Sequence, residues 1–203
     1  MTTLADAKTK EVDTGIREAL EAALARGALP GEREGFDEAA LTAAALFVGR
    51  TANGRLAGQP AIAIETLGEG ANGRFMRIAL INDDMPFLVD SIANALAASD
   101  ITIHRLLHPV LSITRDGDGA LAAILDDDAP GARRESMIYI EADRADAKAR
   151  RALEKALAET LADVRAAVTD WAPMQAAMQA DADAVPDEEG AACCAGSSRA
   201  ISP

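Results

Sequence analysis

The stretch that decides the fold of this chain is IALINDDMPFLVDSI, residues 78–92. It opens with an apolar run typical of a buried strand, and that run stops at an acidic turn. We expect a helix to start at or just after Pro86, because the N–H that proline lacks would be unbonded there anyway. Asp83 and Asp84 stand where a capping side chain and a negative charge favour a helix start. Such a corner can bind a small ligand or serve packing alone, and these residues leave both readings open.

Composition and charge exclude several classes of protein. The 203 residues are 49% hydrophobic and only 3% aromatic, which predicts one core built mainly of Leu, Ile and Val. The formal net charge of −13 argues against binding to nucleic acid or to an anionic membrane. No apolar run is long enough for a transmembrane helix, and no signal-peptide pattern opens the chain. We therefore expect a soluble, cytoplasmic protein.

The segment before the corner predicts two helices and a hairpin. Residues 1–26 carry apolar side chains at four-residue steps, and residues 36–48 form a second helical pattern. This pair could cap a neighbouring domain or dock on a sheet, and the sequence favours neither. Residues 61–65 and 75–81 are predicted as strands joined by a Gly/Asn-rich turn.

The segment after the corner predicts further strands. An extended segment starts at Ile101, and Pro109 marks an edge position or a bulge in it, because proline cannot donate a ladder hydrogen bond. Residues 116–119, Asp-Gly-Asp-Gly, are a strong hairpin signal that leads into a strand at 121–125. Residues 137–140 predict one more strand.

The last regular element is a long helix from about residue 144 to Trp171. Its apolar residues recur at steps of three and four, and Asp143 is placed to cap its start. A helix of this length would extend roughly 40 Å. It should overhang a small sheet and contact something beyond it.

These elements indicate an α+β fold. A ferredoxin-like or ACT-like antiparallel sheet with helices packed on one face fits best, with the N-terminal helices added. The order is not a clean β-α-β-β-α-β, so we expect a circularly permuted or augmented version. The predicted organisation is an N-terminal helical segment and linker at 1–58, the ACT-like domain at 59–172 and a flexible tail at 173–203.

A search for catalytic chemistry yields no catalytic residue and no metal site. His104 and His108 are the only histidines, and on a strand they would lie about 13 Å apart, too far to share one ion. A structural or surface role is favoured for both. Asp83 and Asp84 could act as acid and base, but no nucleophile lies near them in sequence, so capping is favoured. Glycine-rich phosphate loops are absent.

Four ordered blocks carry a family resemblance. The chain resembles the N-terminal region of the large NAD-specific glutamate dehydrogenases of bacteria over roughly residues 75–175. The blocks are NDDMPFLVDS (82–91), IHRLLHPV (103–110), RESMI (134–138) and DVRAAVTDW (163–171). In that family this region is an ACT-like domain, and the domain that binds NAD and glutamate lies far downstream. The resemblance implies that the activity, oxidative deamination of L-glutamate to 2-oxoglutarate and ammonia, belongs to the full enzyme, so this chain should hold no cofactor and be inactive alone.

The resemblance also implies a candidate ligand site at the corner. ACT domains often bind amino acids at the turn between the first strand and helix, where glycine usually follows the proline. Phe87 stands at that position here, and its side chain should obstruct a ligand. Amino-acid binding is therefore a hypothesis beside a purely architectural role. The candidate residues are Asn82, Asp83, Asp84, Met85, Pro86 and Phe87.

The last residues suggest a change of reading frame. From Cys193 to Pro203 the sequence reads CCAGSSRAISP. A neighbouring frame of one permitted codon choice encodes an amphipathic, aromatic-bearing segment, similar to the segment next along the chain in the family. We expect a truncated, frameshifted gene product, with a natural disordered tail as the alternative.

Two classes of function remain. The first is a non-catalytic regulatory or assembly part of a glutamate dehydrogenase, whose partners would be the enzyme's remaining domains, further copies of itself and a possible amino-acid effector. The second is a free-standing ACT-like sensor of small molecules or a scaffold protein.

Overall fold

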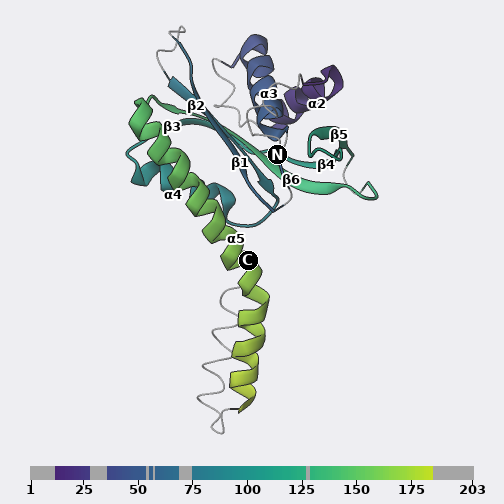
Figure 1. The fold of residues 1–203 in the computed structure, drawn as a ribbon, viewed down its shortest axis with the longest axis vertical. Helices are drawn as coiled ribbons and strands as arrows, with labels where there is room; N and C mark the ends of the chain where they lie inside the picture. Colours follow the sequence, from purple (N-terminus) through teal and green to yellow (C-terminus); the bar gives the residue numbers. More distant parts are fainter. Residues whose placement is uncertain are drawn as a thin grey trace.

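A six-stranded antiparallel sheet forms the centre of the protein in the computed structural model (Figure 1). The structure describes residues 12–27, 36–53, 55–56, 58–68, 75–126 and 129–184. The strands are β1 (Ala61–Thr66), β2 (Phe75–Asp83), β3 (Ile103–Leu107), β4 (Val110–Arg115), β5 (Leu121–Leu125) and β6 (Arg133–Asp143). The predicted hairpins are confirmed, since β1 pairs with β2 and β4 with β5.

Strand β6 organises the sheet. One edge of β6 pairs with all of β2, from Phe75 to Asp83, and the other edge is shared by β3 and β4. The predicted extended segment is therefore two strands, interrupted at His108 and Pro109. The Pro109 carbonyl accepts a hydrogen bond from the Met137 N–H at 2.9 Å, and proline can only accept at such a position.

The strand order explains why the sequence did not read as a clean ferredoxin-like pattern. β2 and β3 both run antiparallel to β6, which lies between them, so β2, its following helix and β3 form a split β-α-β unit. In a ferredoxin-like sheet the last strand pairs with the first. Here β1 occupies that place beside β2 but comes before it in the chain. The predicted α+β class is confirmed in its permuted form, with the β4–β5 hairpin added.

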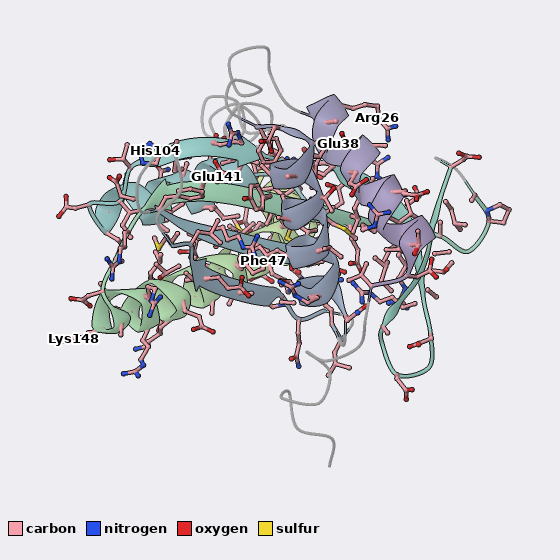
Figure 2. All side chains as sticks on the ribbon, turned by 90° about the horizontal axis from the view of Figure 1, so that it is seen from above. Arg26, Glu38, Phe47, His104, Glu141 and Lys148 are labelled. Carbon is pink, nitrogen blue, oxygen red and sulfur yellow. The ribbon has the colours of Figure 1, made fainter. Side chains whose placement is uncertain are left out.

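Helices cover both faces of the sheet (Figures 1 and 2). Helices α4 (Leu88–Ala98) and α5 (Ala147–Ala184) pack on one face, and α2 (Thr14–Gly27) and α3 (Glu38–Ala52) pack on the other. The alternation of a strand assigns Ile78 and Leu80 to the α4/α5 side and Ala79 and Ile81 to the α2/α3 side. The N-terminal helices therefore dock on the sheet, which the sequence had left open.

The start of α5 corrects one prediction. Asp146, and not Asp143, caps this helix, because its Oδ1 accepts the N–H groups of Lys148 and Ala149 at 2.8 Å each. The Asp143 carboxylate instead bonds His104 Nε2 at 2.8 Å. The cap therefore comes three residues later than predicted.

The end of α5 corrects another. The helix continues past Trp171 and through Pro173 to Ala184, so residues 173–184 are helical where we expected a flexible tail. Its 38 residues would extend about 57 Å. The remaining tail, with the frameshift hypothesis, lies outside the described residues, and the three-part domain division stays a prediction.

Candidate functional site

The predicted corner lies where β2 leaves the sheet. β2 ends at Asp83 and α4 begins at Leu88, two residues after Pro86. Phe87 precedes the helix in a left-handed conformation, with φ at 68°, and its side chain makes no capping hydrogen bond. The predicted capping roles of Asp83 and Asp84 are therefore wrong.

Asp83 lies between two arginines that come from opposite faces of the sheet. Its Oδ1 accepts a hydrogen bond from Arg55 Nη2 at 2.8 Å, and Arg55 follows α3 in the chain. Its Oδ2 is 2.9 Å from Nη1 of Arg165, which belongs to α5. Burial raises the pKa of Asp83, but hydrogen bonds and charges from both arginines outweigh burial and hold this pKa below its usual value. Asp83 thus joins the two helical layers.

The Arg55 guanidinium continues the network into the protein. Arg55 Nη1 lies 2.5 Å from Glu135 Oε1, and both side chains are only 1% exposed. Arg115 holds the same carboxylate with two bonds of 2.9 and 2.6 Å, and it also donates to the carbonyls of Ala52 and Gly119. Each of these two carboxylates is held by two guanidinium groups, Asp83 by Arg55 and Arg165 and Glu135 by Arg55 and Arg115.

Asn82 is the most buried of the predicted site residues, at 1% exposure. Its Oδ1 accepts a hydrogen bond from Arg165 Nη2 at 2.8 Å. Its Nδ2 is buried and has no hydrogen-bond partner among the described residues. Such an unsatisfied donor costs free energy, and it is the feature of the corner most compatible with a bound group.

The other predicted residues do not converge on a common point. The Asp84 carboxylate contacts Arg134 Nε at 3.2 Å and Ser136 Oγ at 3.1 Å, which ties the turn to β6. Met85 packs against the core beneath α4 and α5. Pro86 is exposed, and Phe87 is 57% exposed.

The two histidines have separate environments. His104 lies on the surface beside Asp143 (Figure 2). His108 lies between β3 and β4, where burial lowers its pKa and the nearby Asp84 charge opposes that shift. Neither histidine belongs to a group of three or more metal-binding side chains, since no such group occurs in the described ranges.

A second charged cluster lies beneath the N-terminal layer, toward the other end of the sheet. The Arg77 guanidinium lies 4.4 Å from the Phe47 ring centroid and donates to Glu65 at 2.8 Å. In Figure 2, Phe47 and Glu141 lie on the sheet side of this layer. These contacts hold α3 on the sheet.

Tyr139 and Glu141 extend this cluster along β6. The Tyr139 hydroxyl donates to Glu141 Oε1 at 2.9 Å, and burial with the neighbouring carboxylate raises the pKa of Tyr139 far above its usual value. The other Glu141 oxygen pairs with Arg105, whose guanidinium stacks 4.4 Å from the Phe36 ring centroid. This tyrosine stays protonated at any physiological pH.

Sequence reasoning missed the arginines and glutamates of both clusters. One signal was available, because Glu135 and Glu141 have the same strand parity as the buried Met137 and Tyr139. A charge on the inward side of a strand predicts a buried partner. The sequence could not say which arginine supplies it.

Comparison with known proteins places this architecture in a family. Residues 22–157 match the family profile described as "Glutamate dehydrogenase, ACT1 domain". The chain is 42% identical over 102 residues to the NAD-specific glutamate dehydrogenase of Pseudomonas aeruginosa, a match covering 49% of this chain and 6% of that protein. It is 41% identical over 107 residues to the enzyme of the same description from Halomonas elongata, covering 51% of this chain and 7% of that protein. None of the described helices has the length and apolarity needed to cross a membrane. The chain belongs to the glutamate dehydrogenase ACT1-domain family.

Proposed function

We propose that this chain is a non-catalytic regulatory or assembly module of an NAD-specific glutamate dehydrogenase. The observation that carries the proposal is the ACT1 match over residues 22–157. The aligned part makes up only 6–7% of the length of the two glutamate dehydrogenases compared with this chain. By this proposal, NAD and glutamate bind elsewhere in the full enzyme. The module's partners are the remaining domains and further copies of the same chain, in the cytoplasm.

The chemistry of the corner supports an architectural role. Asp83 and Glu135 are held by arginines, and Asp84 is bonded to β6. A general acid or base must lie within hydrogen-bond reach of the substrate, and these carboxylates are instead bonded to arginine side chains. These groups instead hold the two helical layers against the sheet.

The direct test is a dehydrogenase assay on the purified chain. With glutamate and NAD at saturating concentrations, the absorbance of reduced NAD should not rise above the rate without protein. The positive control is a full-length enzyme of the family under the same conditions. Glutamate-dependent turnover by this chain, surviving further purification, would contradict the proposal.

The sensor reading is the second candidate, with Asn82, Asp83, Asp84, Met85, Pro86 and Phe87 as its site. The observation in its favour is the buried, unpaired Nδ2 of Asn82 at a corner where α4 has no side-chain cap. Isothermal titration with a panel of amino acids decides between the two. The architectural role predicts no heat at millimolar ligand, whereas saturable heat that is lost in Asn82→Leu would establish the sensor.

A further inference from the structure

The junction between β3 and β4 holds a histidine that none of the contacts described above uses. His108 stands at the break between the two strands, directly before Pro109, and its side chain is half-buried. The Nε2 atom of its ring is itself buried and has no hydrogen-bond partner among the described residues. This setting has a different free-energy cost for each protonation state of the ring.

A neutral imidazole fits this setting better than a charged one. A neutral ring carries a single proton, which can lie on Nδ1 and leave Nε2 as a bare acceptor. A protonated ring carries a second N–H, on Nε2, and that donor would be buried with no acceptor in the part of the chain that the structure describes. A buried charged donor without a partner costs more free energy than an unpaired neutral acceptor. The folded chain therefore favours the neutral form of His108.

The carboxylate near this ring is already engaged. Asp84, in the turn before α4, carries the negative charge that favours protonation of His108. Its carboxylate is bonded to Ser136 Oγ and to Arg134 Nε, which both belong to β6. Burial outweighs the Asp84 charge, so the pKa of His108 lies below its ordinary value of 6.5. Geometry and electrostatics thus agree on the neutral ring.

The junction is tied to β6 and to α2 through Pro109. The Pro109 carbonyl accepts a hydrogen bond from the Met137 N–H of β6 at 2.9 Å. Gly27, at the end of α2, lies against the Pro109 ring. The basic residue in the last turn of α2, Arg26, is exposed, and an arginine side chain offers no acceptor to an imidazolium. A charged His108 would therefore have to move to find a partner.

We propose that His108 is an acid-sensitive switch, in which uptake of a proton by its ring releases the β3–β4 junction from β6. An imidazolium needs water or a protein acceptor for its Nε2–H, and the junction must shift before Nε2 reaches either one. The next residue makes the Pro109–Met137 hydrogen bond, so we expect that bond to open first. The switch concerns the fold of this chain alone and does not depend on the proposed role in a glutamate dehydrogenase.

Linkage fixes the direction of the pH effect. The unfolded chain protonates His108 near the ordinary pKa of 6.5, and the folded chain does so only at lower pH. The stability that depends on the neutral ring is complete above that value and is lost as the pH falls toward the lowered pKa. In this window the unfolding equilibrium constant should rise by up to about tenfold per pH unit. Asp83 acts in a separate window, below about pH 4.

The first measurement is an NMR titration of the intact chain from about pH 8 to about pH 5. The chain has only two histidines, so His104→Gln assigns both imidazole signals. We expect the His108 ring to stay neutral at pH 6.5. At lower pH its protonation should coincide with a loss of exchange protection at the Met137 amide, relative to the amides of β2 on the other edge of β6.

The second measurement compares chemical denaturation at about pH 7.5 and about pH 5.5. His108→Gln places an uncharged side chain at the junction at both values, so its stability should fall less on acidification than that of the unaltered chain. The matched control is His104→Gln, at a side chain 52% exposed, which should leave most of the acid loss in place. The titration of the unaltered chain decides the question even if His108→Gln does not fold.

Three outcomes overturn the inference. The first is a His108 ring that is protonated at or above pH 6.5 while the chain is folded. The second is an acid loss of stability that is equal in His108→Gln and in the unaltered chain. The third is a Met137 amide that keeps its protection after His108 has taken up its proton. The dehydrogenase assay is independent of all three, so failure here is distinguishable from failure of the proposed function.

Discussion

The two faces of the sheet are held to their helices in different ways. On the α4/α5 side the core is a continuous set of aliphatic side chains from Met76 to Val164. On the α2/α3 side apolar residues share the space with four buried charged residues, Arg55, Arg77, Glu135 and Glu141. Apolar burial has no preferred direction, whereas ion pairs require particular partners at particular positions. One layer therefore depends on total buried area, and the other depends on a few specific contacts.

The largest expected effect comes from breaking the charged side. Glu135→Ala leaves Arg55 and Arg115 without their shared carboxylate, and an uncompensated buried charge costs about 3–5 kcal/mol of unfolding free energy. Chemical denaturation measures this loss. The neighbouring Arg134→Ala, at a side chain 61% exposed, should cost about 0–1 kcal/mol. Equal losses in the two variants would show that the buried Glu135 ion pairs stabilise the fold no more than an exposed ion pair does.

On the apolar side, Leu157→Ala should cost about 2–5 kcal/mol, because it removes buried methyl groups and leaves a cavity between α5 and the sheet. The exposed Glu154→Ala on the same helix serves as control and should change stability by less than about 0.5 kcal/mol. The Leu157 loss should be the same at low and high salt. A strong salt dependence of the Leu157 loss would contradict apolar packing at this position.

The difference between the faces also explains what the sequence could predict. The period of Leu153, Leu157 and Leu161 identified α5, and the Asp-Gly-Asp-Gly turn identified the β4–β5 hairpin, because both signals are local. Predicting the roles of Asp83 and Glu135 required knowing that Arg55 comes to the end of the sheet. That is a long-range contact, which neither periodicity nor capping rules encode.

Helix ends were predicted less well for a related reason. Asp143 was predicted to cap α5, but the pairing of β6 with β2 extends the strand through Asp143, and the helix begins only at Ala147. Sheet pairing overrode the local capping preference there. At the corner, the Asp83 carboxylate similarly bonds Arg55 and Arg165 and does not cap α4.

A smaller effect is expected at Phe87, an exposed residue between β2 and α4 that belongs to neither core. Its positive φ is a conformation that glycine adopts at little cost and other residues do not. Phe87→Gly should therefore leave stability unchanged or raise it by up to about 1 kcal/mol, although the ring is lost. Phe87→Ala loses the same ring and keeps the strain, so a variant as stable as Phe87→Gly would contradict this account. Thermal unfolding compares them.

The smallest effect is the pH dependence contributed by Asp83. Its pKa is lower in the folded protein than the ordinary value of 3.8, so its contribution to stability is complete above that value. The contribution is lost as the pH falls through the lowered pKa. Asp83→Asn should be less stable at pH 7 and should show a flatter decline below about pH 4. Denaturation midpoints from pH 7 to pH 3 test this, and identical profiles would show that Asp83 contributes no acid sensitivity.

The central claim is that the charged network makes the N-terminal helices and the ACT-like sheet one cooperative body. Native-state hydrogen exchange in increasing denaturant tests it most directly, because it reports the free energy of opening for each element. We expect the amides of α3, of β2 and β6, and of α5 up to Val168 to merge to one opening free energy in the unaltered chain. In Glu135→Ala, the α2 and α3 amides should open at lower free energy than the sheet. Exchange of α2 and α3 well before the sheet in the unaltered chain would contradict the claim.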